Sequence, residues 1–235
     1  MLQKVLCKDI YFGDYGWHTG RFHFSFADYI DPGNSHFGNL QALNDFHLDP
    51  GTGFDNHPHE EMEIISYCVA GELTHVDNIG NITTLRRGDT QYLSAGSGIF
   101  HQECNESQDQ SLRFVQIWIN PNQNRLTPKY VHTTRDNIYP MNQLMQIAAG
   151  QNGAGAIKIA QDANIYAAEI EQDQQLDYTN PSYRQCYLVC LEGKLSINHI
   201  ELEEGDTLRI CEGVQLSIQA QKQSHLLLVD LAADH

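Results

Sequence analysis

Basic residues are scarce in this sequence. Of its 235 residues, 14 are lysine or arginine and 30 are aspartate or glutamate, which gives a formal net charge of −16. A chain this acidic repels both the phosphate backbone of nucleic acids and anionic lipid surfaces. The only two adjacent basic residues are Arg86 and Arg87. We therefore expect no direct nucleic-acid ligand and no membrane contact, whereas a basic protein partner is compatible with the charge.

Long apolar runs are also missing. Polar and charged side chains interrupt the first nine residues, so these do not resemble a secretory signal. No run approaches the ~18–20 apolar residues that span a membrane. We therefore expect a soluble, cytoplasmic protein whose six cysteines stay reduced. The absence of any CxxC pair argues against a zinc ribbon or a dithiol redox site.

Motifs for nucleotide binding and serine hydrolysis are absent, since the chain has no Walker loop, no GxGxxG and no GxSxG. Helical periodicity is weak, and residues 141–149 form the best helical candidate. Turn-forming residues instead recur about every 8–12 positions between short runs rich in β-branched and aromatic residues, such as 64–69 and 114–119. This pattern predicts an all-β chain that forms a sandwich or a barrel.

Two short patterns occur twice, in the same order. Residues 67–73 are similar to residues 187–195, and the turn at 87–90 is similar to the turn at 204–207. Both pairs are separated by nearly the same length of chain, which indicates two copies of one β-module. Chance similarity is the alternative, because Gly-Asp turns draw on few residue types.

Two pairs of metal-ligating side chains follow Gly-rich turns. His57 and His59 are separated by one residue, as are His101 and Glu103. Alternate residues of a strand point to the same face, so each pair projects to one side of its strand. If the two strands face one another inside a barrel, three imidazoles and one carboxylate converge and leave open metal positions for substrate or O2. A lone His-x-His in a loop is ordinary polar surface, so the second pair strengthens the argument.

The residue types narrow the choice of metal. Imidazole suits Fe, Ni, Cu, Co and Zn, whereas one hard carboxylate without any thiolate favours Fe(II) over a closed zinc site. We therefore expect one divalent transition metal, Fe(II) first, with Ni, Co, Mn, Cu and Zn as alternatives. Pro58 stands between two of the histidines and has no N–H to donate, so we expect it at a sheet edge or a bulge.

A Gly- and Asn-rich junction at residues 151–155 separates the two modules. It places a predicted N-terminal domain at 1–135 and a C-terminal domain at 150–235. At the repeat offset, the four metal-ligating residues correspond in the second copy to Thr179, Pro181, Ile218 and Ala220. None of these is a good metal ligand. We therefore expect metal in the N-terminal domain alone, while the C-terminal domain contributes packing and a surface for a partner.

Longer motifs resemble the pirin family of the cupin superfamily. Residues 51–71 follow the first cupin motif, with the spacing G-x5-H-x-H-x3-E-x7-G, and residues 88–105 follow the second. The segments HPH at 57–59, HVDNIGN at 75–81 and SAGSGIFHQE at 94–103 are closer still to pirins. The resemblance implies a bicupin fold, in which two double-stranded β-helix (jelly-roll) barrels pack face to face.

The resemblance also implies roles for individual residues. It makes His57, His59, His101 and Glu103 the metal ligands, with Glu103 as the catalytic base. Glu63 occupies the place of a carboxylate ligand in many other cupins and is the alternative ligand or base. A hydrogen bond from Glu63 that supports a ligand is the better interpretation.

Further residues are assigned to the framework. His75 recurs in the pirin pattern, and we expect it either in the barrel wall or in a hydrogen bond to a ligand. An aromatic cluster near the N-terminus is expected in the core rather than at a substrate surface; it consists of Trp17, Phe22, Phe24, Phe26 and Tyr29.

For bacterial pirins, the resemblance implies a dioxygenase that opens the central ring of a flavonol such as quercetin with O2 and releases carbon monoxide. Nothing in the residue spacing itself specifies quercetin. The alternative is a metal-binding regulatory protein that acts through protein–protein contacts without turnover. A sugar-isomerase-like cupin fits the fold but not the pirin-specific segments.

Overall fold

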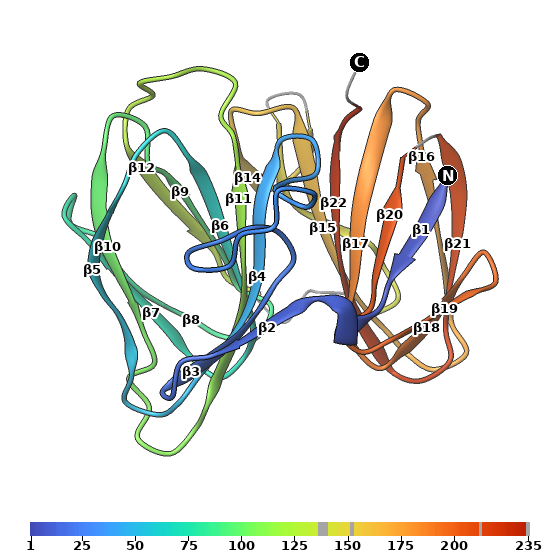
Figure 1. Ribbon diagram of the computed structural model, residues 1–235, viewed down its shortest axis with the longest axis horizontal. Helices are drawn as coiled ribbons and strands as arrows, with labels where there is room; N and C mark the ends of the chain where they lie inside the picture. The colour runs from blue at the N-terminus through green and yellow to red at the C-terminus, as the bar shows by residue number, and fades with distance from the viewer. Residues whose placement is uncertain (136–140, 151–152, 212, 234–235) are drawn as a thin grey trace. The chain divides into compact units, whose positions relative to one another are not determined.

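The computed structural model describes residues 1–135, 141–150, 153–211 and 213–233. The chain forms two compact units (Figure 1). The N-terminal unit consists of Tyr11–Asp136 and Ile159–Gln161, and the C-terminal unit consists of Met1–Ile10, Asn137–Lys158 and Asp162–His235. Apart from one 3-10 turn at Cys7–Asp9, every regular element in the described ranges is a β-strand, which confirms the all-β prediction. None of the described segments is a helix that could cross a membrane.

The N-terminal unit consists of two antiparallel sheets. Its strands are β2 (Tyr11–Asp14), β3 (His18–Phe22), β4 (Leu40–Leu48), β5 (Gly53–His59), β6 (Glu63–Ala70), β7 (Leu73–Asp77), β8 (Ile82–Leu85), β9 (Thr90–Ser94), β10 (Ile99–Cys104), β11 (Leu112–Ile119) and β12 (Lys129–Thr133). The seven-stranded sheet has the order β12-β9-β6-β11-β4-β3-β2, and the four-stranded sheet has the order β5-β10-β7-β8. The predicted ligands all come from the four-stranded sheet.

The C-terminal unit repeats this arrangement. Its strands are β1 (Leu2–Val5), β13 (Met145–Ala149), β14 (Ile157–Lys158), β15 (Ala163–Ile170), β16 (Gln175–Asn180), β17 (Arg184–Glu192), β18 (Lys194–Ile197), β19 (Ile200–Glu203), β20 (Thr207–Ile210), β21 (Val214–Ala220) and β22 (Ser224–Ala232). The sheet orders are β1-β20-β17-β22-β15-β13-β14 and β16-β21-β18-β19. The first strand of the chain therefore pairs within this unit, which the sequence pattern did not indicate. The domain boundaries at 1–135 and 150–235 stay a prediction.

The glycines of the sequence repeat occupy the same turns in both units. Gly71 joins β6 to β7 and Gly193 joins β17 to β18, with φ of 79° and 86°. Gly88 and Gly205 precede β9 and β20, with φ of 86° and 80°. Positive φ is accessible to glycine at little cost, so these turns explain why glycine recurs at these four positions. The two patterns are copies of one β-module, as predicted.

The helical prediction for residues 141–149 is wrong. Met145–Ala149 forms strand β13, which pairs antiparallel with β15. Ile147 and the two alanines that follow it are buried. Alanine has the highest helix propensity, but such propensities amount to less than about 1 kcal/mol per residue, and the pairing and burial that a strand gains in a sheet outweigh them.

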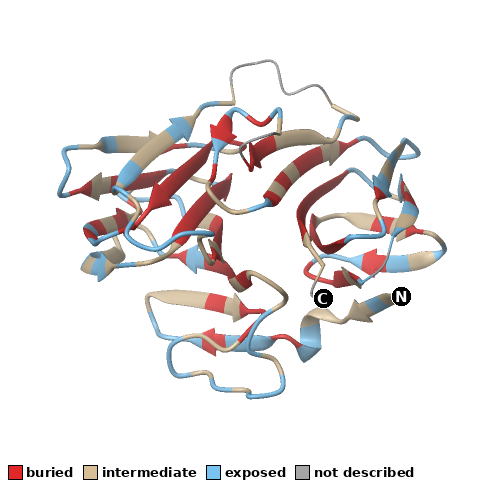
Figure 2. Cartoon of the chain, turned by 90° about the horizontal axis from the view of Figure 1, so that it is seen from above, coloured by how far each residue is buried: buried red, intermediate tan, exposed pale blue. Residues whose placement is uncertain are grey.

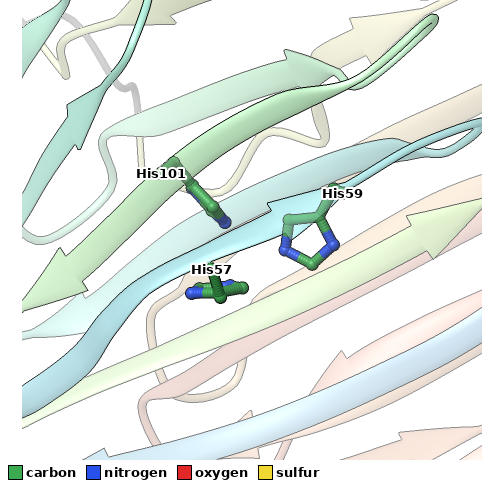
Figure 3. A group of neighbouring side chains, drawn as sticks. All are labelled: His57, His59 and His101. Atoms are coloured by element: carbon green, nitrogen blue, oxygen red, sulfur yellow. The ribbon is translucent and has the colours of Figure 1, made fainter.

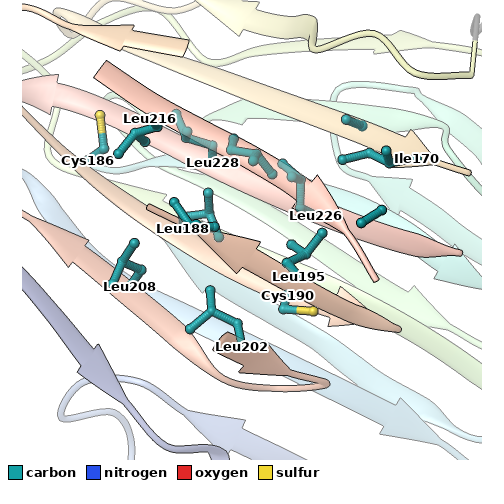
Figure 4. Packing of buried hydrophobic residues seen from close by; sticks show 14 of the residues in the cluster. Ile170, Cys186, Leu188, Cys190, Leu195, Leu202, Leu208, Leu216, Leu226 and Leu228 are labelled. Carbon is teal, nitrogen blue, oxygen red and sulfur yellow. The ribbon is translucent and has the colours of Figure 1, made fainter. Parts of the chain in front are cut away.

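Aliphatic side chains fill the interior of the C-terminal unit (Figure 4). In both units the long strands carry buried residues, drawn in red in Figure 2, along most of their length, as in β17 and β22. The strand pair His75–Glu103 of the N-terminal unit corresponds to the pair Ile197–Ile218 in this unit. The sequence offset had matched Glu103 with Ala220, which is wrong by two residues because β9 and its connection to β10 are together two residues longer than β20 and its connection to β21. Ile218 and Ala220 are both apolar and buried, so neither position offers a metal ligand.

Candidate metal centre

The predicted histidine ligands lie on two neighbouring strands. β5 and β10 pair antiparallel, with His101 opposite His57. His57 and His59 are half-buried and His101 is fully buried, whereas Pro58 is exposed on the other face of β5. β5 lies at the edge of its sheet, as the proline predicted, because a missing N–H needs no partner there.

Three imidazole rings face one another between these strands (Figure 3). His57, His59 and His101 each offer a ring nitrogen, and these nitrogens lie within 4.8 Å of one another. The ring centroids are 4.5–4.8 Å apart. Bonds from nitrogen to an ion such as zinc are ~2.0–2.1 Å long, so small side-chain rotations suffice to bring all three nitrogens onto one ion.

Ring nitrogens at the centre are not engaged by other groups of the protein. Nδ1 of His57 lies 2.7 Å from the carbonyl oxygen of Asp55, so Nδ1–H donates and Nε2 is left unprotonated. Nε2 of His59 and Nε2 of His101 are buried and have no hydrogen-bond partner. Buried polar atoms without a partner are rare because they cost free energy. A metal ion is the ligand that satisfies three converging imidazole nitrogens, so these residues fit a divalent transition metal.

Burial also keeps two of the imidazoles neutral. Burial, followed by the repulsion of the nearby His57, lowers the pKa of His59 to about 4. Burial, followed by the repulsion of the neighbouring imidazoles, lowers the pKa of His101 to about 2. Only the neutral ring can donate a lone pair to a metal, so at neutral pH protons do not compete for these two nitrogens.

Glu103 lies next to the histidines and accepts three hydrogen bonds. Oε1 accepts bonds from Ser66 Oγ at 2.8 Å and Gln91 Nε2 at 2.7 Å, and Oε2 accepts one from Gln116 Nε2 at 2.6 Å. Burial raises the pKa of this carboxyl to about 7, against the opposing effect of the three donors. The carboxylate belongs to a second group of possible metal ligands, with His75 and His101. It is not part of the group formed by the three facing imidazoles. Its role as the fourth ligand stays a prediction.

Glu63 belongs to a different part of the unit. Its strand, β6, lies in the seven-stranded sheet. Oε1 accepts hydrogen bonds from the Tyr92 hydroxyl and the Ala160 N–H, each at 2.6 Å, and Oε2 accepts one from the Gln161 N–H at 2.8 Å. The carboxylate therefore binds the segment Ile159–Gln161 and belongs to neither group of potential metal ligands among the described residues. Ser66 of the same strand bonds Glu103, so strand alternation places Glu63 on the opposite face of β6, directed away from the three histidines.

An aromatic cavity of about 510 Å³ opens beside the three rings. His57, His59 and Glu103 line it, together with Gln116 and Trp118. The rest of its wall is largely aromatic and includes Trp17, Phe26, Phe46 and Phe54.

The predicted aromatic cluster divides between two roles. Phe22 and Phe24 are buried in the core, as expected. The expectation that Trp17 and Phe26 serve only the core is wrong, because both line the cavity. Gln116 and Trp118, on β11, were not anticipated as site residues. A polar Gln and an indole N–H inside a largely apolar strand were the available signal.

Two family models match the chain. The model described as Pirin matches residues 6–119, and the model described as quercetinase C-terminal cupin domain matches residues 146–231. The chain belongs to the pirin family. The predicted cupin modules in both halves are thereby confirmed.

Relatives of this pirin match along nearly its full length. It is 34% identical over 215 residues to a quercetin 2,3-dioxygenase of Escherichia coli K12, covering 92% of this chain and 90% of the relative. It is 36% identical over 220 residues to a pirin-like protein of Caulobacter vibrioides, covering 93% and 94%. The crystal structure of the bacterial pirin YhhW from Escherichia coli in complex with nickel(II) has a TM-score of 0.92, at 31% identity and with 100% of each chain covered.

Proposed function

We propose that this pirin is a metal-dependent dioxygenase that uses O2 to open the central ring of a flavonol such as quercetin and releases one ring carbon as carbon monoxide. The observation that carries the proposal is the set of three converging imidazoles beside an aromatic cavity, two of which have a buried Nε2 without a hydrogen-bond partner. The similarity to a quercetin 2,3-dioxygenase supports it.

His57, His59 and His101 would hold the metal, with Glu103 as a further ligand. Fe(II) is our first choice, and Ni(II), Co(II), Mn(II), Cu(II) and Zn(II) are compatible with the same donors. When bound, such an ion supplies Lewis-acid polarisation of the flavonol hydroxyl and carbonyl oxygens and a site for O2. Three protein nitrogens leave coordination positions open for both.

The cavity would orient the substrate. Its volume falls within the ~300–1,000 Å³ typical of small-molecule sites. Trp17, Phe26, Phe54 and Trp118 offer aromatic faces and edges to a flat, three-ring flavonol. These apolar walls also exclude water from the reacting ring.

Glu103 would accept the proton of the flavonol hydroxyl. Its pKa of about 7 lies close to working pH, which is the condition for an efficient general base. The donors Ser66, Gln91 and Gln116 fix the carboxylate and stabilise its charged form. A base held in this way takes up the proton without first having to be oriented.

The test is quercetin turnover by protein reconstituted with Fe(II), Ni(II), Co(II) or Mn(II), followed by absorbance together with O2 uptake. We expect turnover that requires metal and disappears in the double variant His57→Ala/His59→Ala. His47→Ala is the matched control, because His47 is an exposed histidine of β4 outside the cavity. Absence of turnover with every metal, despite stoichiometric binding, would overturn the proposal and direct attention to a protein partner.

A further inference from the structure

A second buried histidine lies behind His101. Nδ1 of His101 is 3.4 Å from Nδ1 of His75, and Nε2 of His75 is 3.2 Å from Oδ2 of Asp77. β7 and β10 are paired neighbours, with His101 opposite Asp77 and Glu103 opposite His75. Both histidine side chains are fully buried and Asp77 is 8% exposed, so this chain of contacts is shielded from water.

The proton on each nitrogen follows from the carboxylate at the end of the chain. Oδ1 of Asp77 accepts the backbone N–H groups of Ile79 and Asn81, and Oδ2 accepts Nδ2–H of Asn81. The Asp77 carboxylate is therefore an acceptor toward His75 as well, and His75 must carry its proton on Nε2. A neutral His75 then has a lone pair on Nδ1, so His101 donates from its own Nδ1–H.

We propose that Asp77 and His75 are positioning residues that lock His101 in the tautomer whose Nε2 is free for metal. That Nε2 is the same atom that is buried without a partner at the metal centre. The opposite tautomer of His75 would place two N–H groups face to face. The proposal rests on the metal site of the proposed function and is independent of the substrate.

Stacking holds the middle member of this chain in place. The ring of Tyr130, on β12, lies 4.3 Å from the ring of His75 with an interplanar angle of 15°. His75 could instead bind metal itself, in a group with His101 and Glu103. Both ring nitrogens of His75 already have partners, because Nε2 contacts Asp77 and Nδ1 contacts His101. The parallel contact with Tyr130 also fixes the plane of the ring. Both facts favour the positioning role.

The direct test is long-range ¹H–¹⁵N correlation NMR of the histidine rings in the metal-free, full-length protein. We expect His75 as the Nε2–H tautomer and His101 as the Nδ1–H tautomer, and we expect Asp77→Asn to abolish the preference at His75. His101 protonated on Nε2, or His75 on Nδ1, would overturn the proposal. A change in the ¹⁵N chemical shift of a His75 ring nitrogen that indicates direct coordination of Zn(II) would also overturn it.

Metal affinity provides the second readout. We expect Asp77→Asn and His75→Phe to bind Ni(II) about 10- to 100-fold more weakly and to change the visible spectrum of bound Co(II). His75→Phe retains an aromatic ring against Tyr130, so a role in packing alone would leave affinity intact. Asp89→Asn is the matched control, because Asp89 is also buried but accepts backbone N–H bonds from Arg86 and Arg135. Wild-type affinity in both test variants would overturn the proposal. Failure of the wild-type protein to bind any ion would overturn the proposed function instead. The histidine tautomers seen by NMR would still test the positioning role of Asp77 and His75.

Discussion

The indole of Trp118 stands edge-on to the imidazole of His59, with ring centroids 5.0 Å apart and planes at 87°. The same indole donates Nε1–H to Oε1 of Gln116 at 2.8 Å. Gln116 in turn donates Nε2–H to Oε2 of Glu103 at 2.6 Å. One wall residue of the cavity therefore contacts a histidine of the candidate metal centre and orients, through one amide, the buried carboxylate.

This relationship predicts the effect of Trp118→Phe. The variant retains an aromatic edge against His59 but loses the donor to Gln116, so the amide can rotate away from Glu103. We expect kcat/KM for quercetin to fall about 10-fold, equivalent to ~1.4 kcal/mol, without loss of bound metal. Trp17→Phe is the control, since it makes the same change elsewhere in the cavity wall. Equal losses in both variants would show that the hydrogen bond has no special role.

The pKa of Glu103 predicts how the stability of the metal-free protein depends on pH. Burial raises this pKa from 4.5 to about 7. Between these values the unfolded chain is ionised at Glu103 and the folded chain is not, so stability is lost as pH rises, by up to ~1.4 kcal/mol per pH unit. Urea unfolding of wild type and Glu103→Gln at pH 5 and pH 7 measures the contribution. We expect the advantage of wild type over the variant to shrink toward pH 7. The same pH dependence in both proteins would contradict this.

Glu63→Gln separates a structural carboxylate from a metal ligand. The amide can still accept from Tyr92 and Ala160, but its NH2 group faces the Gln161 N–H and leaves that donor without its acceptor. We expect a loss of ~1–3 kcal/mol in the free energy of unfolding and no change in Ni(II) affinity. A drop in affinity at wild-type stability would instead make Glu63 a ligand.

Gly71 provides a test of the repeated turn. Its φ is 79°, and an added Cβ would clash with the carbonyl oxygen of Ser111. Gly80 has a φ of 102°, but a Cβ added there would meet no atom within 4 Å. Gly80→Ala should therefore cost about 1 kcal/mol of stability, and Gly71→Ala about 1–3 kcal/mol more. Thermal or chemical unfolding measures both, and equal costs would mean that the clash relaxes freely.

Local patterns in the sequence were sufficient for much of the fold and part of the site. Alternation along a strand indicated that His57 and His59 share a face, and the missing N–H of Pro58 indicated an edge strand. Both inferences depend on residues within one strand. Glycine turns revealed the two modules for the same reason, since a positive φ is a property of a single residue.

The contacts around Glu103 depend on pairing between distant strands and could not be predicted in this way. Ser66, Gln91 and Gln116 come from β6, β9 and β11, all in the other sheet of the unit. The correspondence between modules failed by two residues because one strand and the loop after it are each one residue longer in the N-terminal unit. Register between strands is set by such loops and by tertiary packing, which a repeat offset does not capture.

In the proposed function, the three histidines hold the metal that supports ring-opening dioxygenation. The most direct measurement is the carbon monoxide released per quercetin consumed by metal-reconstituted protein in O2-saturated buffer, beside His57→Ala/His59→Ala. We expect one carbon monoxide for each quercetin lost in wild type and none in the variant. Quercetin loss without carbon monoxide, or equal release from the variant, would contradict it.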